Sequence, residues 1–208
     1  MTVSLQPGSI LEAYLGDPRS LDRVSTLERL RLADAHLALH ADAVAELVRA
    51  MTDRLCTLTC TERALIIDAA WLHDIGKLTI APETLNKPGP LTDAEWIEMR
   101  DHPGRGADFL NLSPGLRQLA PFVRHHHERN DGTGYPDGLA GSDIPLGARL
   151  IGVADAYDAM ISWRPYRAPR SETDARAELR RCSGSQFDPD VVALFLDVVS
   201  LPRSQRRT

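Results

Sequence analysis

Aromatic residues are scarce in this sequence of 208 residues, at 5% of the total, so its core must be built mainly from Leu, Ala, Val and Ile. Cysteine is scarcer still: the chain has three, Cys56, Cys60 and Cys182, and their spacing matches no zinc-binding pattern. We interpret them as free thiols of a reducing compartment. The sequence therefore predicts neither a disulfide scaffold nor a cysteine-ligated zinc domain.

Long apolar runs are also absent. No stretch of about 18 apolar residues exists, so we predict no transmembrane helix and no membrane partner. The first 20 residues carry Glu12 and Asp17 and lack a basic start before an apolar run, which argues against a secretion signal and for a cytoplasmic protein. The net charge of −5 makes the chain a poor general binder of nucleic-acid polymers. An anionic substrate would need a local basic site.

Apolar residues recur mostly at helical steps, and few segments alternate with a strand period, so we predict an all-α fold. Thr59 with Glu62 and Thr92 with Glu95 form capping-box patterns at two helix starts. The predicted helices cover 27–55, 59–76, 92–99, 113–123, 148–162, 171–182 and 188–199, the last opened by Asp188-Pro189. Residues 128–147, rich in Gly and Pro, are predicted to be loop. We expect a lead-in or short helix over 1–25, one domain over 26–200 and a basic tail over 201–208.

The distinctive chemistry lies in His and Asp residues at or near predicted helix ends. His73 and Asp74 are adjacent and close an apolar helix. Neighbours on a helix point about 100° apart, so this pair suits two metal ions better than one. Five of the seven histidines with two aspartates could form a nitrogen and oxygen shell, which suits iron, manganese or a related divalent ion. Taken singly, each of these residues could instead be a surface or core residue.

An ordered series of motifs runs through residues 36–200. It comprises His73-Asp74-Ile75-Gly76-Lys77, Leu85-Asn86-Lys87-Pro88-Gly89, His102-Pro103, His126-His127-Glu128-Arg129, Asp131-Gly132-Thr133-Gly134-Tyr135-Pro136, Val153-Ala154-Asp155-Ala156-Tyr157-Asp158-Ala159 and Arg164-Pro165-Tyr166-Arg167. This series resembles the HD superfamily of metal-dependent phosphohydrolases, and within it the HD-GYP branch. The resemblance implies an HD-superfamily helical bundle with an HD-GYP extension.

The resemblance also implies the site. The family's metal ligands fall on His40, His73, Asp74, His102, His126, His127 and Asp155. It implies two divalent ions, iron or manganese, bridged by the catalytic Asp74, with Lys77 beside the metals and the substrate phosphate. Arg164 and Arg167 match the residues that hold substrate phosphates; the alternative is that this pair forms surface salt bridges.

One position departs from the family pattern. Some members hold a third metal with a glutamate one turn before the first histidine, where this sequence has His36. His36 is a candidate ligand of a third metal, or a candidate for contact with the other ligands. We favour two ions. His125 matches no ligand position and is predicted not to bind metal.

The resemblance implies hydrolysis of cyclic di-GMP to linear pGpG, and then to GMP. It also implies docking of a diguanylate cyclase domain on Gly134, Tyr135 and Pro136, unless these residues only shape the rim of the site. Two alternatives stay open: an HD-superfamily hydrolase of another cyclic dinucleotide or nucleotide, and a catalytically silent docking module. The sequence predicts no oligomeric state.

Overall fold

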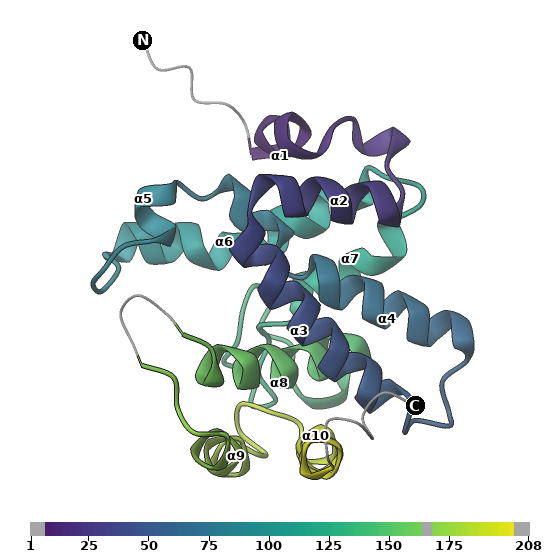
Figure 1. Cartoon of the computed structure of the whole chain (residues 1–208), viewed down its shortest axis with the longest axis vertical. Helices are drawn as coiled ribbons and strands as arrows, with labels where there is room; N and C mark the ends of the chain where they lie inside the picture. The colour runs from purple at the N-terminus through teal and green to yellow at the C-terminus, as the bar shows by residue number, and fades with distance from the viewer. Residues whose placement is uncertain (1–6, 164–167, 202–208) are drawn as a thin grey trace.

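The computed structural model describes residues 7–163 and 168–201, and within them every regular element is a helix (Figure 1). The predicted all-α fold is confirmed. The α-helices are α1 (Pro7–Leu15), α2 (Arg23–Ala33), α3 (Ala35–Thr52), α4 (Cys60–Leu72), α5 (Pro82–Leu85), α6 (Asp93–Asn111), α7 (Ala120–His125), α8 (Leu146–Ile161), α9 (Glu172–Arg181) and α10 (Pro189–Ser200). Short 3-10 helices are η1 (Pro18–Ser20), η2 (Ile75–Thr79), η3 (Arg117–Leu119) and η4 (Gly141–Asp143).

The single helix predicted over 27–55 is wrong: the structure has two helices here, α2 and α3, with a break between them at Asp34. Asp34 adopts an extended backbone (φ −150°, ψ 104°), and its carboxylate accepts the backbone N–H of Leu37 at 2.9 Å. An aspartate side chain that satisfies a free N–H in this way starts a new helix. The apolar spacing runs on across the break, and so the sequence pattern hides it.

The caps predicted for α4, α6 and α10 are confirmed. Thr59 and Thr92 each form a reciprocal capping box with the glutamate three residues later, and Asp188 accepts the backbone N–H groups of Asp190 and Val191. α6, however, continues beyond its predicted extent, through Pro103 to Asn111.

The helix predicted to open at Ser113-Pro114 is wrong at its start. Turns and η3 occupy this stretch, and α7 begins only at Ala120 with Pro121 in its first turn. A proline lacks an N–H and fits that first turn at no cost, so Pro121 marks the start instead. The loop predicted over 128–147 contains η4, and α8 begins within its last residues.

The N-terminal segment belongs to the same core as the rest. Leu11 and Leu15 of α1 are fully buried, and α1 contacts η2 and α6. The centre of the core is formed by α3, α4, α7 and α8: α4 and α8 contact each other, and both contact α3 and α7. Tyr157 of α8 packs edge-on against Phe195 of α10. The predicted site lies where α3, α6 and α8 converge on the ends of α4 and α7.

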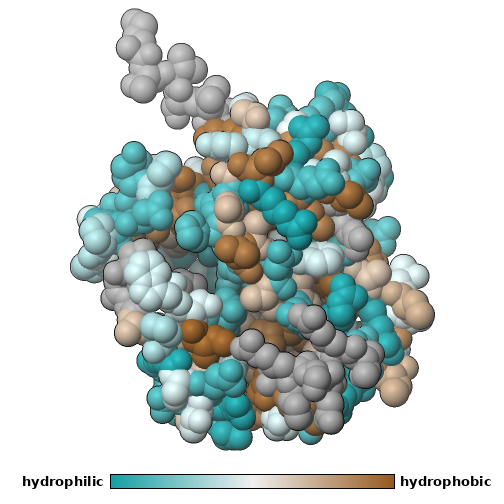
Figure 2. All heavy atoms as spheres, in the orientation of Figure 1, coloured by the Kyte–Doolittle hydropathy of each residue, from teal (hydrophilic) through white to brown (hydrophobic). Residues whose placement is uncertain are grey.

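The surface is mixed. Hydrophilic residues cover most of the face in Figure 2, with apolar residues scattered between them, several over α1 to α3. Tyr14, Val24, Leu32 and Leu39 are exposed large apolar side chains of these three helices. In the described part of the chain, no helix combines the length and the apolar character needed to cross a membrane.

Candidate metal centre

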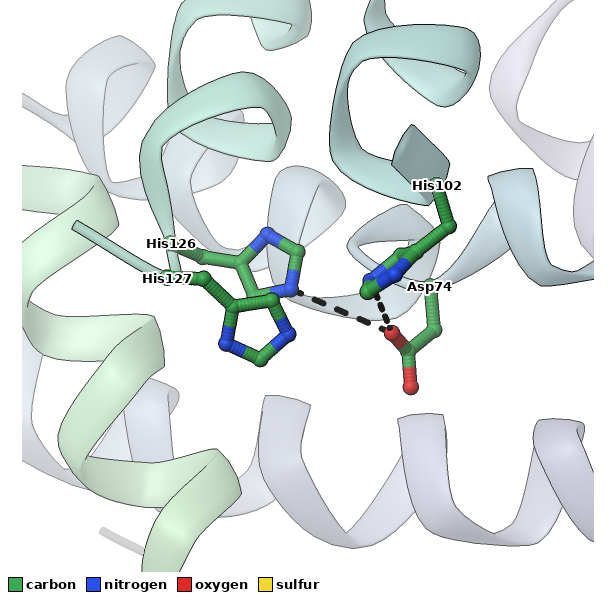
Figure 3. A group of neighbouring side chains, drawn as sticks. All are labelled: Asp74, His102, His126 and His127. Atoms are coloured by element: carbon green, nitrogen blue, oxygen red, sulfur yellow. Dashed lines mark ion pairs between the residues drawn. The ribbon is translucent and has the colours of Figure 1, made fainter. Parts of the chain in front are cut away.

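Five helices bring the predicted ligands to one place. α3 supplies His40, the end of α4 supplies His73 and Asp74, α6 supplies His102, the end of α7 supplies His126 and His127, and α8 supplies Asp155. Their ligand atoms form two sets, each with members within 4.8 Å of one another: Asp74, His102, His126 and His127 in the first, and His40, His73 and Asp155 in the second. Figure 3 shows the first set pointing toward one another, with the adjacent His126 and His127 on one segment and Asp74 and His102 on others.

Two glycines allow the backbone to approach closely at this site. A Cβ atom on Gly76 would collide with the carbonyl oxygen and carbon of His102, so only glycine lets η2 lie directly against α6. A Cβ atom on Gly152 would lie 2.8 Å from the carbonyl oxygen of His126. Gly152 thus lets α8 approach the end of α7, which brings Asp155 toward the histidines.

Three histidines are oriented in the same way. Nδ1 donates to the carbonyl oxygen three residues earlier, at 2.7 Å in His73, 2.6 Å in His102 and 2.7 Å in His126. A carbonyl can only accept, so Nδ1 of each ring carries a proton, and the neutral form of the ring presents the lone pair of Nε2 to the site. This arrangement prepares all three rings to bind a cation through Nε2.

Asp74 belongs to the first set and also reaches the second. Its Oδ1 is 3.0 Å from Nε2 of His102 and 3.9 Å from Nε2 of His126, whereas its Oδ2 is 3.3 Å from Nε2 of His73 and 3.8 Å from Nε2 of His40. Each carboxylate oxygen therefore faces a different set of imidazoles. A carboxylate placed in this way can join two metal ions.

The donor atoms fit divalent metal ions. Nε2 of His73, His102 and His126 and Oδ1 of Asp74 are buried and have no hydrogen-bond partner. Burying lone pairs against lone pairs without a partner is costly, and a cation among them removes that cost. No thiol belongs to either set, and oxygen with imidazole nitrogen suits iron or manganese better than a cysteine-type zinc site.

Charges at the site favour ionised carboxylates. Burial alone would raise the pKa of Asp74, but Lys77 and His73 outweigh it and hold this pKa well below the usual range. Burial acts in the same direction on the pKa of Asp155, which hydrogen bonding to His40 instead lowers. Both aspartates are therefore carboxylates at neutral pH, as cation ligands must be.

The histidines differ in their charge. Burial opposes a charge on His40, yet hydrogen bonds to Asp155 and then Asp158 raise its pKa to about 9. Burial, together with the nearby His102, lowers the pKa of His127 to about 3, so His127 is neutral and free to bind a cation. In the metal-free protein His40 therefore holds a proton between its Nε2 and Asp155, 3.1 Å apart.

The remaining predicted residues are placed as follows. The Lys77 ammonium contacts Oδ2 of Asp74 at 2.5 Å, directly beside the site. His36 is exposed on α3 and belongs to neither set of ligand atoms. Arg164 and Arg167 lie outside the described residues, and their roles stay predictions.

The Gly-Tyr-Pro loop reaches the site through its tyrosine. The half-buried Tyr135 ring lies 5.0 Å from the His127 ring, and the Arg100 guanidinium lies 5.6 Å from the Tyr135 ring centroid. Gly134 comes so close to Arg129 N and Glu128 Cα that a side chain there would collide with them. The tyrosine is therefore packed toward the histidines, and a docking role for this loop stays a prediction.

A third group of potential ligands includes residues of this loop but is better described as an ion-pair network. It consists of His125, Glu128 and Asp137. The guanidinium of Arg124 donates to both oxygens of Asp137, each at 2.7 Å, and Oε1 of Glu128 accepts the Asp137 backbone N–H. The positive charge of Arg124 would repel a metal ion, so this group fixes the loop.

One residue of the site was missed from the sequence. Asp158 is buried, and its carboxylate accepts a hydrogen bond from Nδ1 of His40 at 2.7 Å. It lies three residues after Asp155 in α8, so the two carboxylates share one helix face. That spacing was visible in the sequence, but its partner on α3 was not.

Comparison with known proteins gives consistent matches. The family model described as HD domain matches residues 25–191. A cyclic di-GMP phosphodiesterase of Vibrio cholerae is 40% identical over 166 residues, which are 76% of this chain and 34% of that protein. A cyclic di-GMP phosphodiesterase of Pseudomonas aeruginosa is 39% identical over 180 residues, 85% of this chain and 42% of that protein. The chain thus spans between about a third and two fifths of these relatives.

Other relatives have different substrate names. A 3′3′-cGAMP-specific phosphodiesterase of Vibrio cholerae is 36% identical over 167 residues, 80% of this chain and 36% of that protein. The solved structure of a cyclic GMP-AMP-specific phosphodiesterase of V. cholerae superimposes with a TM-score of 0.56 and 28% identity, over 88% of this chain and 41% of that one. Bd1817, described as an HDG"Y"P protein of Bdellovibrio bacteriovorus, shares the fold, with a TM-score of 0.66, 17% identity, and coverage of 96% of this chain and 74% of that one.

Proposed function

Because the chain belongs to the HD domain family, we propose that it is a metal-dependent phosphodiesterase that hydrolyses cyclic di-GMP. Membership of this family implies that the protein binds divalent metal. The observation that carries this proposal is the position of Asp74, whose two oxygens each face a different set of imidazoles. Two ions bridged by such a carboxylate are the arrangement used for in-line displacement at phosphorus. The names and the identity of the cyclic di-GMP relatives support the substrate.

We propose two ions, iron or manganese, held by the seven residues of the two sets. When bound, the ions lower the pKa of a water and polarise the phosphoryl oxygens. The third-metal role of His36 has weaker support, since its side chain is exposed and lies outside both sets. A shell of imidazole nitrogen and carboxylate oxygen without thiolate supports the choice of iron or manganese over zinc.

The chain's own residues would perform the remaining steps. Lys77, beside Asp74, supplies a positive charge that balances the growing charge on the phosphate, and Arg164 and Arg167 are proposed to hold the substrate phosphates. A water oxygen bonds to phosphorus as the bond from phosphorus to the ribose 3′ oxygen breaks, and a proton passes to that oxygen. The product is linear pGpG, and a second hydrolysis gives GMP.

Product analysis with metal quantification on the same sample tests this proposal. The full chain, purified without oxygen and loaded with Mn²⁺, should convert cyclic di-GMP to pGpG. Asp74→Ala should lose turnover and bound metal together, whereas Asp188→Asn, which removes a carboxylate that belongs to neither set of ligand atoms and pairs with Arg149, should keep both. Normal turnover by Asp74→Ala would refute the bridging role. Two bound Mn²⁺ without hydrolysis would refute the substrate and leave the metal site intact.

A second candidate substrate is 3′3′-cGAMP, because relatives at 36% and 40% identity are named for it. Metal ligands contact phosphate and cannot distinguish the bases. Equimolar cyclic di-GMP, 3′3′-cGAMP and cyclic di-AMP in one reaction would rank the substrates by their kcat/KM values. A catalytically silent module would hydrolyse none of them.

The docking role of Gly134, Tyr135 and Pro136 is also a proposal. Pro136 is exposed and available for contact, whereas Tyr135 packs against His127. Binding of a diguanylate cyclase domain to wild type, but not to Pro136→Ala, in a calorimetric titration would support it. Equal binding by both proteins would contradict it.

A further inference from the structure

His40 stands apart from the other histidines of the site. His73 and His126 lie at helix ends, and His102 precedes Pro103, so each has a nearby carbonyl that the helix leaves unbonded. His40 lies inside α3, where the carbonyl three residues earlier is used by the helix itself. Its Nδ1 therefore needs an acceptor from elsewhere in the fold.

That acceptor is Asp158 of α8. Its Oδ2 accepts from His40 Nδ1 at 2.7 Å and from the Ser162 hydroxyl at 3.2 Å, and the Asp158 side chain is 10% exposed. The Asp158 backbone carbonyl also accepts the Ser162 N–H at 2.9 Å, which caps the end of α8. The carboxylate is thus fixed from two directions before any ion binds.

The geometry points to a role outside the ligand set. Nδ1 and Nε2 lie on different sides of the imidazole ring, and Nε2 faces Asp155 and Asp74, at 3.1 and 3.8 Å. Asp158 lies on the Nδ1 side, and neither set of ligand atoms includes it. It can act on a metal ion only through His40.

We propose that Asp158 is a positioning residue that aims Nε2 of His40 at the ion bound by His40, His73 and Asp155. This inference rests on the proposed two-ion site and deepens it. A carboxylate on the far nitrogen holds the ring in one tautomer and one orientation and makes Nε2 a stronger ligand. The backbone carbonyls that accept from His73, His102 and His126 also hold each ring in one tautomer and one orientation, but they carry no charge.

The proposal predicts an asymmetric loss of metal. Loss of such a partner typically weakens metal affinity by about 10–100-fold. Asp158→Asn should therefore weaken one of two Mn²⁺ equivalents by this factor. The other equivalent, bound by the set of Asp74, His102, His126 and His127, should be unchanged. Asp158→Ala should have the larger effect, because the amide of asparagine can still accept from Nδ1. Ser162→Ala should weaken the same equivalent less.

Calorimetric titration with Mn²⁺ alone measures this, without nucleotide, so that failure of the substrate assignment cannot affect the result. Electron paramagnetic resonance gives a second readout, because a coupled pair of Mn²⁺ ions and a single ion have different spectra. The matched control is Asp188→Asn, whose side chain is 11% exposed and whose carboxylate accepts from Arg149 of α8, the helix that also carries Asp158. It should lower stability but keep two equivalents.

Two results would overturn the inference. One is two wild-type equivalents in both Asp158→Ala and Asp158→Asn. The other is an equal weakening of both equivalents in folded Asp158→Asn, which would indicate general loosening of the site. If Asp158→Ala does not fold, comparing the Mn²⁺ affinities of Asp158→Asn and Ser162→Ala with those of the control still tests whether Asp158 positions His40.

Discussion

Gly76→Ala should damage both stability and the metal centre. Its new Cβ atom would overlap the carbonyl group of His102 and also approach Gly106 N to 2.9 Å. All of these are backbone atoms, so no side chain can rotate away, and η2 and α6 must separate. Overpacking of a core costs about 1–3 kcal/mol, and a backbone collision belongs at the upper end, about 3 kcal/mol. For a chain of this size, that lowers Tm by roughly 6–12 °C.

The same separation moves Asp74 away from His102, whose Nε2 is now 3.0 Å from Oδ1. Bound Mn²⁺ should therefore fall along with Tm. Gly104→Ala is the control within α6, because its Cβ would meet only a side-chain atom of Arg124 at 3.5 Å. Alanine favours a helix by about 1 kcal/mol over glycine, so the control should be as stable as wild type or more. Wild-type Tm and metal content in Gly76→Ala, by calorimetry and elemental analysis, would refute this reasoning.

Three further predictions concern single residues. The pKa of His40 is about 9 in the metal-free protein, above the 6.5 of a free histidine. The charged form of His40 therefore contributes to the free energy of unfolding. This contribution is fully present below about pH 6.5 and is lost as the pH rises through 9. Since a metal needs the neutral ring, Mn²⁺ binding at pH 7.5 should release about one proton from His40; titrations in buffers of different ionisation enthalpy would detect it, and no release would contradict the pKa. Asp34→Ala should lower the free energy of unfolding by about 1 kcal/mol, measured by urea denaturation, through loss of the cap that starts α3; an unchanged midpoint would count against the cap. Pro103→Ala should raise Tm, because it restores a backbone N–H to α6. It should also weaken Mn²⁺ binding, because that N–H competes with His102 Nδ1 for the Met99 carbonyl. Stronger Mn²⁺ binding would contradict this competition.

The sequence predicts helices best where a local signal fixes their ends. The capping boxes at Thr59 and Thr92 and the Asp188-Pro189 start are local, since a side chain bonds a backbone group three residues away. Asp34 caps α3 in the same way, but the apolar spacing continues on both sides of it. That spacing predicts one continuous helix, whereas the cap predicts a new helix start. The burial of Leu11 and Leu15 could not be predicted, because α6 and η2, their partners, are far away in the sequence.

For the site, the sequence identifies the candidate ligands, whereas the structure shows which of their atoms face one another. Motif order predicts the seven candidate ligands, and all seven lie in the two sets. That each oxygen of Asp74 faces a different set could not be predicted, since it depends on how closely η2 and α8 approach their neighbours at Gly76 and Gly152. Asp158 was missed for a related reason. Its role depends on one hydrogen bond between residues 118 positions apart.

The positions of the histidines follow from helix chemistry. A helix leaves its last carbonyls without N–H partners, and a proline creates the same vacancy within a helix. His73, His102 and His126 each occupy such a point, and each uses a carbonyl three residues earlier to fix its ring. A histidine within an uninterrupted helix lacks this acceptor and must recruit one from another element, as His40 recruits Asp158. Helix ends therefore orient ligands at little cost, whereas a ligand inside a helix makes the site depend on a second helix.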